Sequence, residues 1–272
     1  MKHLLLSAAA IAMLTAPSLA ADVVYQEPMM DSAPMMDVMP VASGWTGLYV
    51  GVQGGGAFNP EDPDNVTLSP NGFAFQGSAI QRAFGSNFDS NFDSSFIGGA
   101  HIGYDYQIDQ IVLGVVADLN ALDVTRSSNA DSNTPAFYRT NRNLDYLGTV
   151  RARAGYLVTP SALAYATGGL AYGEVDYSFS TNSPAALGNN PRAIVSEDED
   201  DFGYTVGGGM EVKFTENMSF GAEYLYTNLG GSGSTRLSGG PFAGGVNGST
   251  DFDVNDDFDF HTVTAKISYK FN

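Results

Sequence analysis

Apolar and polar residues alternate along several parts of this chain. In residues 202–214, FGYTVGGGMEVKF, one face carries aromatic and aliphatic side chains, and the other carries Gly, Thr, Glu and Lys. A period of two is typical of β-strands, because successive side chains point to opposite faces. The same alternation recurs and predicts eight strands, at about 46–57, 95–108, 111–122, 144–157, 162–179, 202–214, 218–229 and 259–271.

The connections between these segments alternate in length. Three are short, with the sequences DQ, VTPS and TEN, and four are long, at about 58–94, 123–143, 180–201 and 230–258. Short turns on one side and long loops on the other are typical of outer-membrane barrels. The pattern therefore predicts an all-β protein: an eight-stranded antiparallel transmembrane up-and-down β-barrel, with short periplasmic turns and four long extracellular loops.

The direction of the two faces separates this barrel from a soluble, lipocalin-like one, whose apolar face points inward. Arg151 and Arg153 lie two apart in GTVRARAGYLV and therefore share a face. Facing lipid near the midplane, each guanidinium would cost about 2–4 kcal/mol. Facing a polar lumen, each can pair with a carboxylate. The loop asymmetry and the aromatic residues near the strand ends also favour the membrane barrel.

The polar face predicts a set of ionisable side chains in the lumen, five bases and five acids, in a paired network. Buried charges are tolerated when they are partnered. Glycines on the same face leave room for the long side chains. The network either fills the lumen as a structural plug or lines a narrow ion path, and eight strands favour the plug. The predicted members are Asp105, Asp118, Arg151, Arg153, Glu174, Glu211, Lys213, Glu223, Lys266 and Lys270.

Residues 1–20 have the pattern of a cleaved signal peptide: Lys2, a short apolar run and APSLA. Residues 21–44 are rich in Pro, Asp and Met and predict a flexible periplasmic leader, which leaves 45–272 for the barrel. The repeated MMD in this leader suggests either Cu(I) binding by thioethers or a linker, and the lack of His or Cys nearby favours the linker.

Composition narrows the function further. The formal net charge is −18, which argues against nucleic acid as a partner, since phosphates require basic patches. With no cysteine in the chain, disulfides and thiolate metal sites are excluded. The acidic run at 197–201, EDEDD, could hold Ca²⁺, but it lacks the spacing of a calcium loop and is better interpreted as a solvated charge run.

Several stretches resemble a known family. They are WTGLYVGVQGG, LDYLGTVRARAGY, ATGGLAYG, YTVGGGMEVKFTENMSFGAEYLYTNLG and FDFHTVTAKISYKF, and together they cover about 44–272 apart from the outer loops. In sequence and order they are similar to the small outer-membrane β-barrel proteins of alphaproteobacteria, the porin-family surface antigens that include RopB-like and hemin-binding proteins.

The resemblance implies export to the outer membrane of a Gram-negative cell. It also implies as partners the barrel assembly machinery, periplasmic chaperones, and outer-membrane lipids and lipopolysaccharide. Tyr269 and Phe271 match the alternating aromatics of the C-terminal assembly signal, whereas Asn272 departs from members that end on Phe.

Four functions remain open at this stage. The first is a structural, non-enzymatic barrel that presents acidic loops to surface or host ligands, with no cofactor. The second is a hemin-binding protein, for which His261 is a weak candidate ligand, Tyr138 a loop alternative, and His101 a lumen residue. The third is a small-solute porin. The fourth is a lipid-directed enzyme, for which His261 has only Thr262 nearby.

Overall fold

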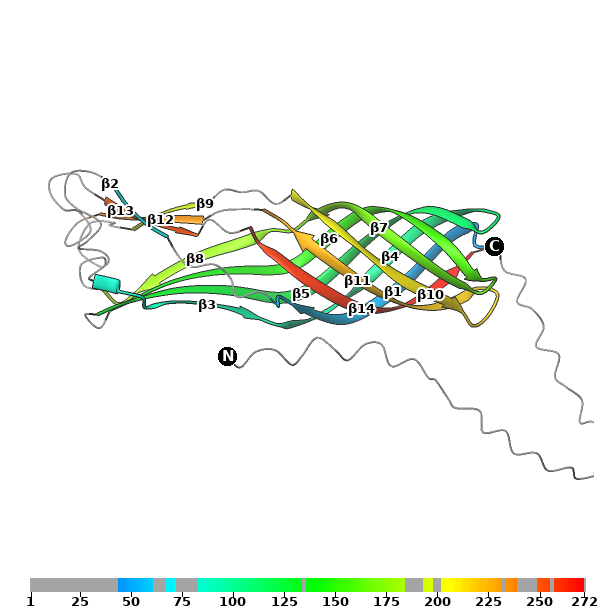
Figure 1. The fold of residues 1–272 in the computed structure, drawn as a ribbon, viewed down its shortest axis with the longest axis horizontal. Helices are drawn as coiled ribbons and strands as arrows, with labels where there is room; N and C mark the ends of the chain where they lie inside the picture. Colours follow the sequence, from blue (N-terminus) through cyan, green and yellow to red (C-terminus); the bar gives the residue numbers. More distant parts are fainter. Residues whose placement is uncertain are drawn as a thin grey trace, which may run out of the picture. The chain divides into compact units, whose positions relative to one another are not determined.

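Eight strands close into a ring. In the computed structural model each strand is antiparallel to both neighbours, and pairing of the first strand with the last closes the ring (Figure 1). The predicted eight-stranded barrel is confirmed. Its strands are β1 (Gly47–Phe58), β4 (Ser95–Ile108), β5 (Ile111–Ser132), β6 (Ala136–Thr159), β7 (Ala162–Tyr172), β10 (Phe202–Lys213), β11 (Met218–Asn228) and β14 (Asp259–Lys270).

The structure describes residues 44–60, 67–71, 83–133, 136–183, 193–197, 202–230, 233–238, 249–254 and 257–271. The predicted signal peptide, all of the leader before residue 44, residues 198–201 of the acidic run and Asn272 lie outside the described residues. Within the described part of the chain, no helix is long and apolar enough to cross a membrane.

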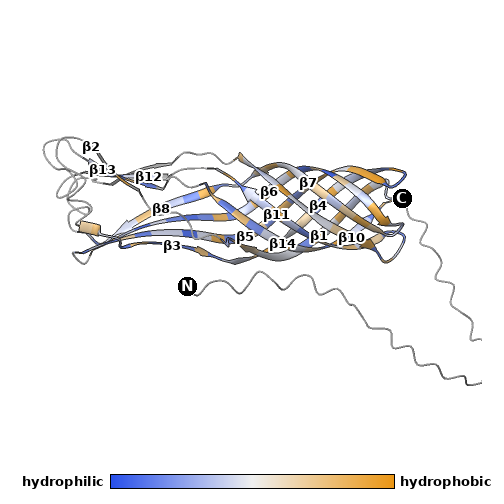
Figure 2. Cartoon of the chain, viewed as in Figure 1, coloured by the Kyte–Doolittle hydropathy of each residue, from blue (hydrophilic) through white to orange (hydrophobic). Residues whose placement is uncertain are grey.

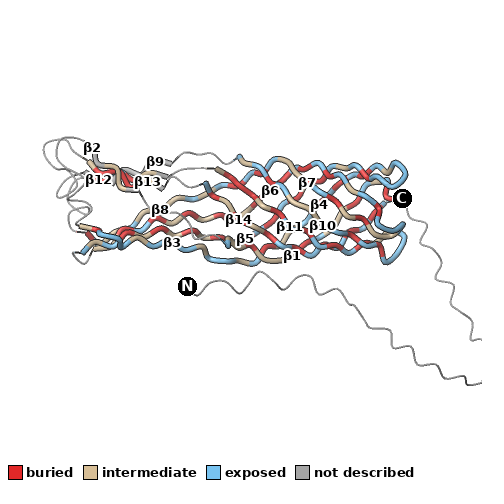
Figure 3. The backbone as a smooth tube through the Cα atoms, in the orientation of Figure 1, coloured by how far each residue is buried: buried red, intermediate tan, exposed pale blue. Residues whose placement is uncertain are grey.

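Burial alternates along the barrel strands, as Figure 3 shows by its change between buried and exposed residues. Val150 on β6 is 62% exposed, whereas Arg151 beside it is 1% exposed. Because successive side chains of a strand point to opposite faces, ring closure puts one set inside and the other outside. The apolar set is therefore outside, and the charged set is inside.

Two strands continue well past the barrel. β5 and β6 stay paired up to Ser132 and Ala136, so the prediction of a loop at 123–143 is wrong. This segment is a hairpin, and two short strands extend it into a sheet: β3 (Phe88–Asp93) pairs with β5, and β8 (Val175–Thr181) pairs with β6. The predicted strand 162–179 is also divided, because pairing breaks at Gly173 and Glu174.

A second, four-stranded sheet packs against these extensions. Its order is β2 (Thr67–Asn71), β13 (Ser249–Val254), β12 (Gly233–Ser238) and β9 (Ala193–Glu197). Apolar side chains from both sheets meet in one cluster, which we call the outer core: Phe84, Ala130, Tyr138, Leu237 and Phe252. The long connections thus contain a small hydrophobic core of their own, separate from the barrel.

Because the outer core is separate from the barrel, a mutation in it should destabilise the sheets packed around it and leave the barrel folded. Phe252 is 1% exposed, and its ring centroid lies 5.2 Å from that of Tyr138. Phe252→Ala should cost the outer core about 3–5 kcal/mol, since a large buried side chain is removed. Digestion of whole cells by an added protease should accelerate, while heat-modifiability of the barrel on gels stays unchanged.

Phe137→Ala is the matched control, because Phe137 lies in the same hairpin but is only partly buried and outside the outer core. Equal protection of the Phe252→Ala variant and the wild type would contradict the existence of this core.

Candidate functional site: the charged interior of the barrel

The barrel lumen contains two ion-pair clusters. In the first, Arg151 Nη2 donates to Asp118 Oδ2 at 2.6 Å, and Arg151 Nη1 lies 3.1 Å from Glu223 Oε1. Lys266 Nζ donates to the same Glu223 oxygen at 2.7 Å, and Tyr165 OH donates to the other at 2.9 Å. Strands from opposite sides of the ring are therefore joined through one arginine.

The second cluster centres on Arg153. Arg153 Nε donates to Asp105 Oδ1 at 2.8 Å, a second nitrogen contacts Asp105 Oδ2, and Nη1 donates to Glu211 Oε2 at 3.0 Å. The guanidinium carbon lies 4.9 Å from the ring centroid of Tyr49 and 5.0 Å from that of Tyr165. Two carboxylates and two aromatic rings thus surround one cation, which charge-assisted hydrogen bonds and cation–π contacts both stabilise.

Two lysines close the short-turn end of the lumen around Trp45. Lys213 Nζ donates to Gly44 O at 2.8 Å and lies 4.8 Å from the Trp45 ring centroid. Lys270 Nζ donates to Trp45 O and lies 4.0 Å from Asp105 Oδ2. Trp45 is 1% exposed, and its indole N–H donates to Pro160 O at 3.2 Å. These lysines therefore use backbone carbonyls and the indole face more than carboxylates.

Nine of the ten predicted lumen residues are buried, and Glu174 is not. Glu174 is exposed and accepts a hydrogen bond from Tyr146 OH at 2.9 Å. The prediction that Glu174 lies in the lumen is wrong because odd-numbered residues, such as Tyr165 and Thr167, point inward on β7. The even-numbered residues of this segment point outward, and Asp176 is likewise exposed.

Glycines make room for large inward groups. A Cβ at Gly103 would lie 2.3 Å from Tyr49 OH, and one at Gly209 would lie 2.7 Å from Tyr165 OH. The two rings that sandwich Arg153 therefore occupy the space that these glycines leave. The prediction assigned this space to lysine and arginine side chains, and the structure gives it to aromatic rings at these two positions.

An apolar layer fills the loop end of the lumen. Its members are Ala57, Ile97, Leu122, Val124, Leu144, Leu147, Ala171, Leu229, Phe258 and Phe260, each at most 7% exposed. Beyond this layer, Arg126 Nη1 lies 3.4 Å from Asp259 Oδ1. The charged clusters therefore lie between Trp45 at one end and an apolar layer at the other.

The histidines and the loop tyrosine have different surroundings. His101 is buried, and its Nε2 is 2.9 Å from Ser268 Oγ. His261 is on the outer face, where its Nδ1 is 2.6 Å from Tyr224 OH. Tyr138 is buried in the outer core, so it does not present its ring to a surface ligand. Thr262 is buried on the opposite face from His261, so these two cannot act as nucleophile and base.

Tyr269 and Phe271 lie on the outer face near the short turns, 46% and 48% exposed, with ring centroids 5.1 Å apart. Their role in assembly stays a prediction. Among the described residues, no group of three or more His, Cys, Asp or Glu side chains is arranged to hold a metal ion.

The prediction from sequence missed the aromatic side chains that point into the lumen. Trp45, Tyr49 and Tyr165 are inward aromatics that hold the cations. The signal was present for Tyr49 in β1, because it shares the parity of Gly51 and Gln53, which also point inward. Trp45 precedes the first strand, so its direction could not be inferred from alternation.

Neutralising Arg153 should destabilise the barrel strongly. Arg153→Met leaves Asp105 and Glu211 buried without their main cation, at a cost of about 3–5 kcal/mol. Arg139→Met is the matched control on the same strand. Arg139 is exposed, with its guanidinium 4.9 Å from the Phe137 ring centroid, and its loss should cost about 0.5 kcal/mol or less. Urea unfolding in micelles measures both, and equal losses would contradict the role of the cluster.

Comparison with known proteins agrees with the barrel. A family model described as "Outer membrane protein beta-barrel domain" matches residues 6–271. The chain is 32% identical over 279 residues, covering all of both chains, to the 31 kDa outer-membrane immunogenic protein of Brucella melitensis. It is 34% identical over 187 residues, covering 69% of this chain and 65% of that protein, to the 22 kDa outer membrane protein of Rhizobium leguminosarum.

Among solved structures, the outer membrane protein OprG from Pseudomonas aeruginosa matches 85% of this chain and 99% of its own, at 18% identity and a TM-score of 0.43. The family model spans nearly the whole chain, and the first relative is aligned from end to end. This protein therefore belongs to the family of outer-membrane β-barrel proteins and resides in the outer membrane of a Gram-negative cell.

Proposed function

We propose that this protein is a non-conducting structural barrel that presents two sheets at the cell surface. They are the extension formed by β3, β5, β6 and β8, and the four-stranded sheet, and we call them the outer sheets. The observation that carries the proposal is the filling of the lumen at three successive levels. Trp45 occupies the short-turn end, the Arg151 and Arg153 clusters occupy the middle, and an apolar layer occupies the loop end. An eight-stranded barrel is just wide enough for its own side chains, which supports the same conclusion.

The outer sheets support surface presentation. The described strands of the long connections pack around an apolar core of their own, so the exposed side chains of these strands have fixed positions. The Brucella relatives are named immunogenic outer-membrane proteins, which suits a chain whose outer part is accessible at the cell surface. Surface or host ligands are the partners that this arrangement favours, and lipopolysaccharide is its neighbour in the membrane.

Delivery to the membrane is part of the same proposal. Tyr269 and Phe271 form an exposed aromatic pair at the last strand, next to the β1–β14 seam. Such a pair is available to the barrel assembly machinery before the ring closes, and residues 1–20 supply the export signal that brings the chain there with periplasmic chaperones.

Purified protein in planar bilayers should show no discrete conductance steps, and vesicles that contain it should not swell in sugar solutions. The expectation rests on the buried ion pairs and the apolar layer, whose side chains occupy the lumen at successive levels. A large porin with a water-filled lumen serves as the positive control. Sugar flux at a rate comparable with that control would overturn the structural function in favour of a small-solute porin.

A second candidate function is hemin binding at His261. Three aromatic rings surround this residue, with centroids 5.9 Å (Phe58), 5.7 Å (Tyr224) and 5.1 Å (Tyr226) from the imidazole. The Tyr224 hydroxyl engages Nδ1, so Nε2 is the nitrogen that could reach an iron. A flat apolar porphyrin can pack on such a surface, and imidazole is a common haem ligand.

A hemin titration tests this candidate. The wild type should produce a shifted Soret band, and His261→Ala should abolish the shift. His101→Ala is the control, since His101 is buried inside the barrel and cannot reach hemin at the outer face. A wild type without any Soret shift, or an unchanged shift in the His261 variant, removes this site.

A further inference from the structure

The outward face of β5 and β6 changes chemistry at one level. On β5, Leu113, Val115 and Leu119 are exposed and apolar, whereas every outward residue from Asp123 to Asp131 is polar or charged. The register of β5 and β6 shifts between Ala121 and Val124, at the same level. Figure 2 shows the hydrophobic colour concentrated on the barrel strands. This level marks where the wall leaves the acyl chains.

Beyond this level the wall continues as a sheet whose outward side chains are mostly polar. One row crosses all four strands, β3, β5, β6 and β8, through consecutive partners: Asn91, Ser127, Asn141 and Ser178. These side chains are exposed or partly exposed. We call the surface around this row the outer polar face. At about 3.3 Å per residue, β5 extends roughly 30 Å past the boundary, through the zone where lipid headgroups and their saccharides lie.

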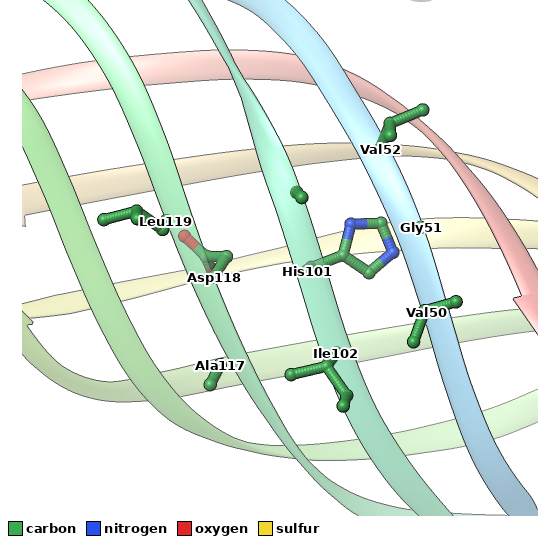
Figure 4. Close-up of a pocket in the computed structure, with 9 residues that line it drawn as sticks. Val50, Gly51, Val52, His101, Ile102, Ala117, Asp118 and Leu119 are labelled. Carbon is green, nitrogen blue, oxygen red and sulfur yellow. The ribbon is translucent and has the colours of Figure 1, made fainter.

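An apolar groove lies below this face on the same wall. It runs across the lipid side of β1, β4 and β5, between the exposed side chains of Val52, Ile102 and Leu119 (Figure 4). Gly51 and Ala100 line it as small residues, and the His101 ring lies behind Gly51, on the lumen side of the wall. β5 contributes Leu119 to the groove and Ser127 to the outer polar face. A molecule with acyl chains and a long polar head can therefore contact both along one strand.

The chemistry of the outer polar face selects sugar hydroxyls. Amide and hydroxyl groups both donate and accept, which matches a saccharide that does the same. The flanking rows carry three carboxylates, Asp89, Asp93 and Asp176, and one cation, Arg139. This excess of negative charge repels phosphate groups. Neutral sugar residues are therefore favoured over the phosphates of a headgroup.

We propose that the outer polar face binds the oligosaccharide of an outer-leaflet glycolipid whose acyl chains pack on the apolar wall below. We choose a glycolipid as the ligand because β5 and β6 run without interruption from the lipid-facing wall of the barrel into this sheet. The proposal deepens the surface role above, and it does not depend on closure of the lumen.

The test compares two double variants that differ by one position on each strand. Ser127→Ala with Asn141→Ala removes two hydrogen-bonding groups from the outer polar face. Ser128→Ala with Thr140→Ala removes two hydroxyls from the same strands, but these are buried on the opposite face. Full-length protein in micelles is titrated with lipid-free core oligosaccharide from rhizobial lipopolysaccharide, and heat-modifiability checks that each variant is folded.

The wild type and the buried control should bind alike, and the outer-face variant should bind about tenfold more weakly, as expected for the loss of two hydrogen bonds. Binding should persist in EDTA. Three results would overturn the proposal: the wild type does not bind, both variants weaken binding equally, or binding is lost in EDTA. The last result would assign binding to cation-bridged phosphate. Bilayer conductance of the same samples tests lumen closure separately.

Discussion

Ring closure is the constraint on which the other features of this protein depend. Once β1 pairs with β14, every strand has two neighbours and every second side chain must enter a narrow interior. Water cannot solvate charges there as it does in bulk, so the interior must supply their partners. Arg151 and Arg153 satisfy this requirement by reaching across the ring, which joins strands that share no backbone pairing. The same alternation leaves an uncharged apolar surface for lipid.

The interior is built in layers with different chemistry. Trp45 and two lysines form the short-turn end, two ion-pair clusters form the middle, and apolar side chains form the loop end. The ion pairs lie between buried Trp45 and the buried apolar layer, and such low-polarity surroundings strengthen electrostatic contacts. The outer sheets also separate side chains by chemistry, since they bury apolar rings and leave amide and hydroxyl groups outside.

The barrel and most of its charged interior could be predicted because strand alternation there has strong contrast. Arg151 and Arg153 differ in polarity from every residue between and beside them. The outer hairpin had no such contrast. For example, positions 127 and 128 point to opposite faces, but both are serine. Glu174 was misplaced because β7 carries Tyr165 and Thr167 inward and small alanines outward. The size and the polarity of these side chains therefore assigned the inward face to different sets of residues. The apolar layer was missed because Leu122 and Val124 continue the inward parity of Asp118 with the opposite chemistry.

The fluorescence of Trp45 should differ between the closed ring and an open sheet. Trp45 is the chain's single tryptophan, and its indole contacts come from the β6–β7 turn, from β10 and from β14. These groups surround it together only when both ends of the chain have met at the seam. The intrinsic fluorescence of this protein therefore reports completion of the cylinder, and it distinguishes a sealed ring from an open sheet with the same strand content.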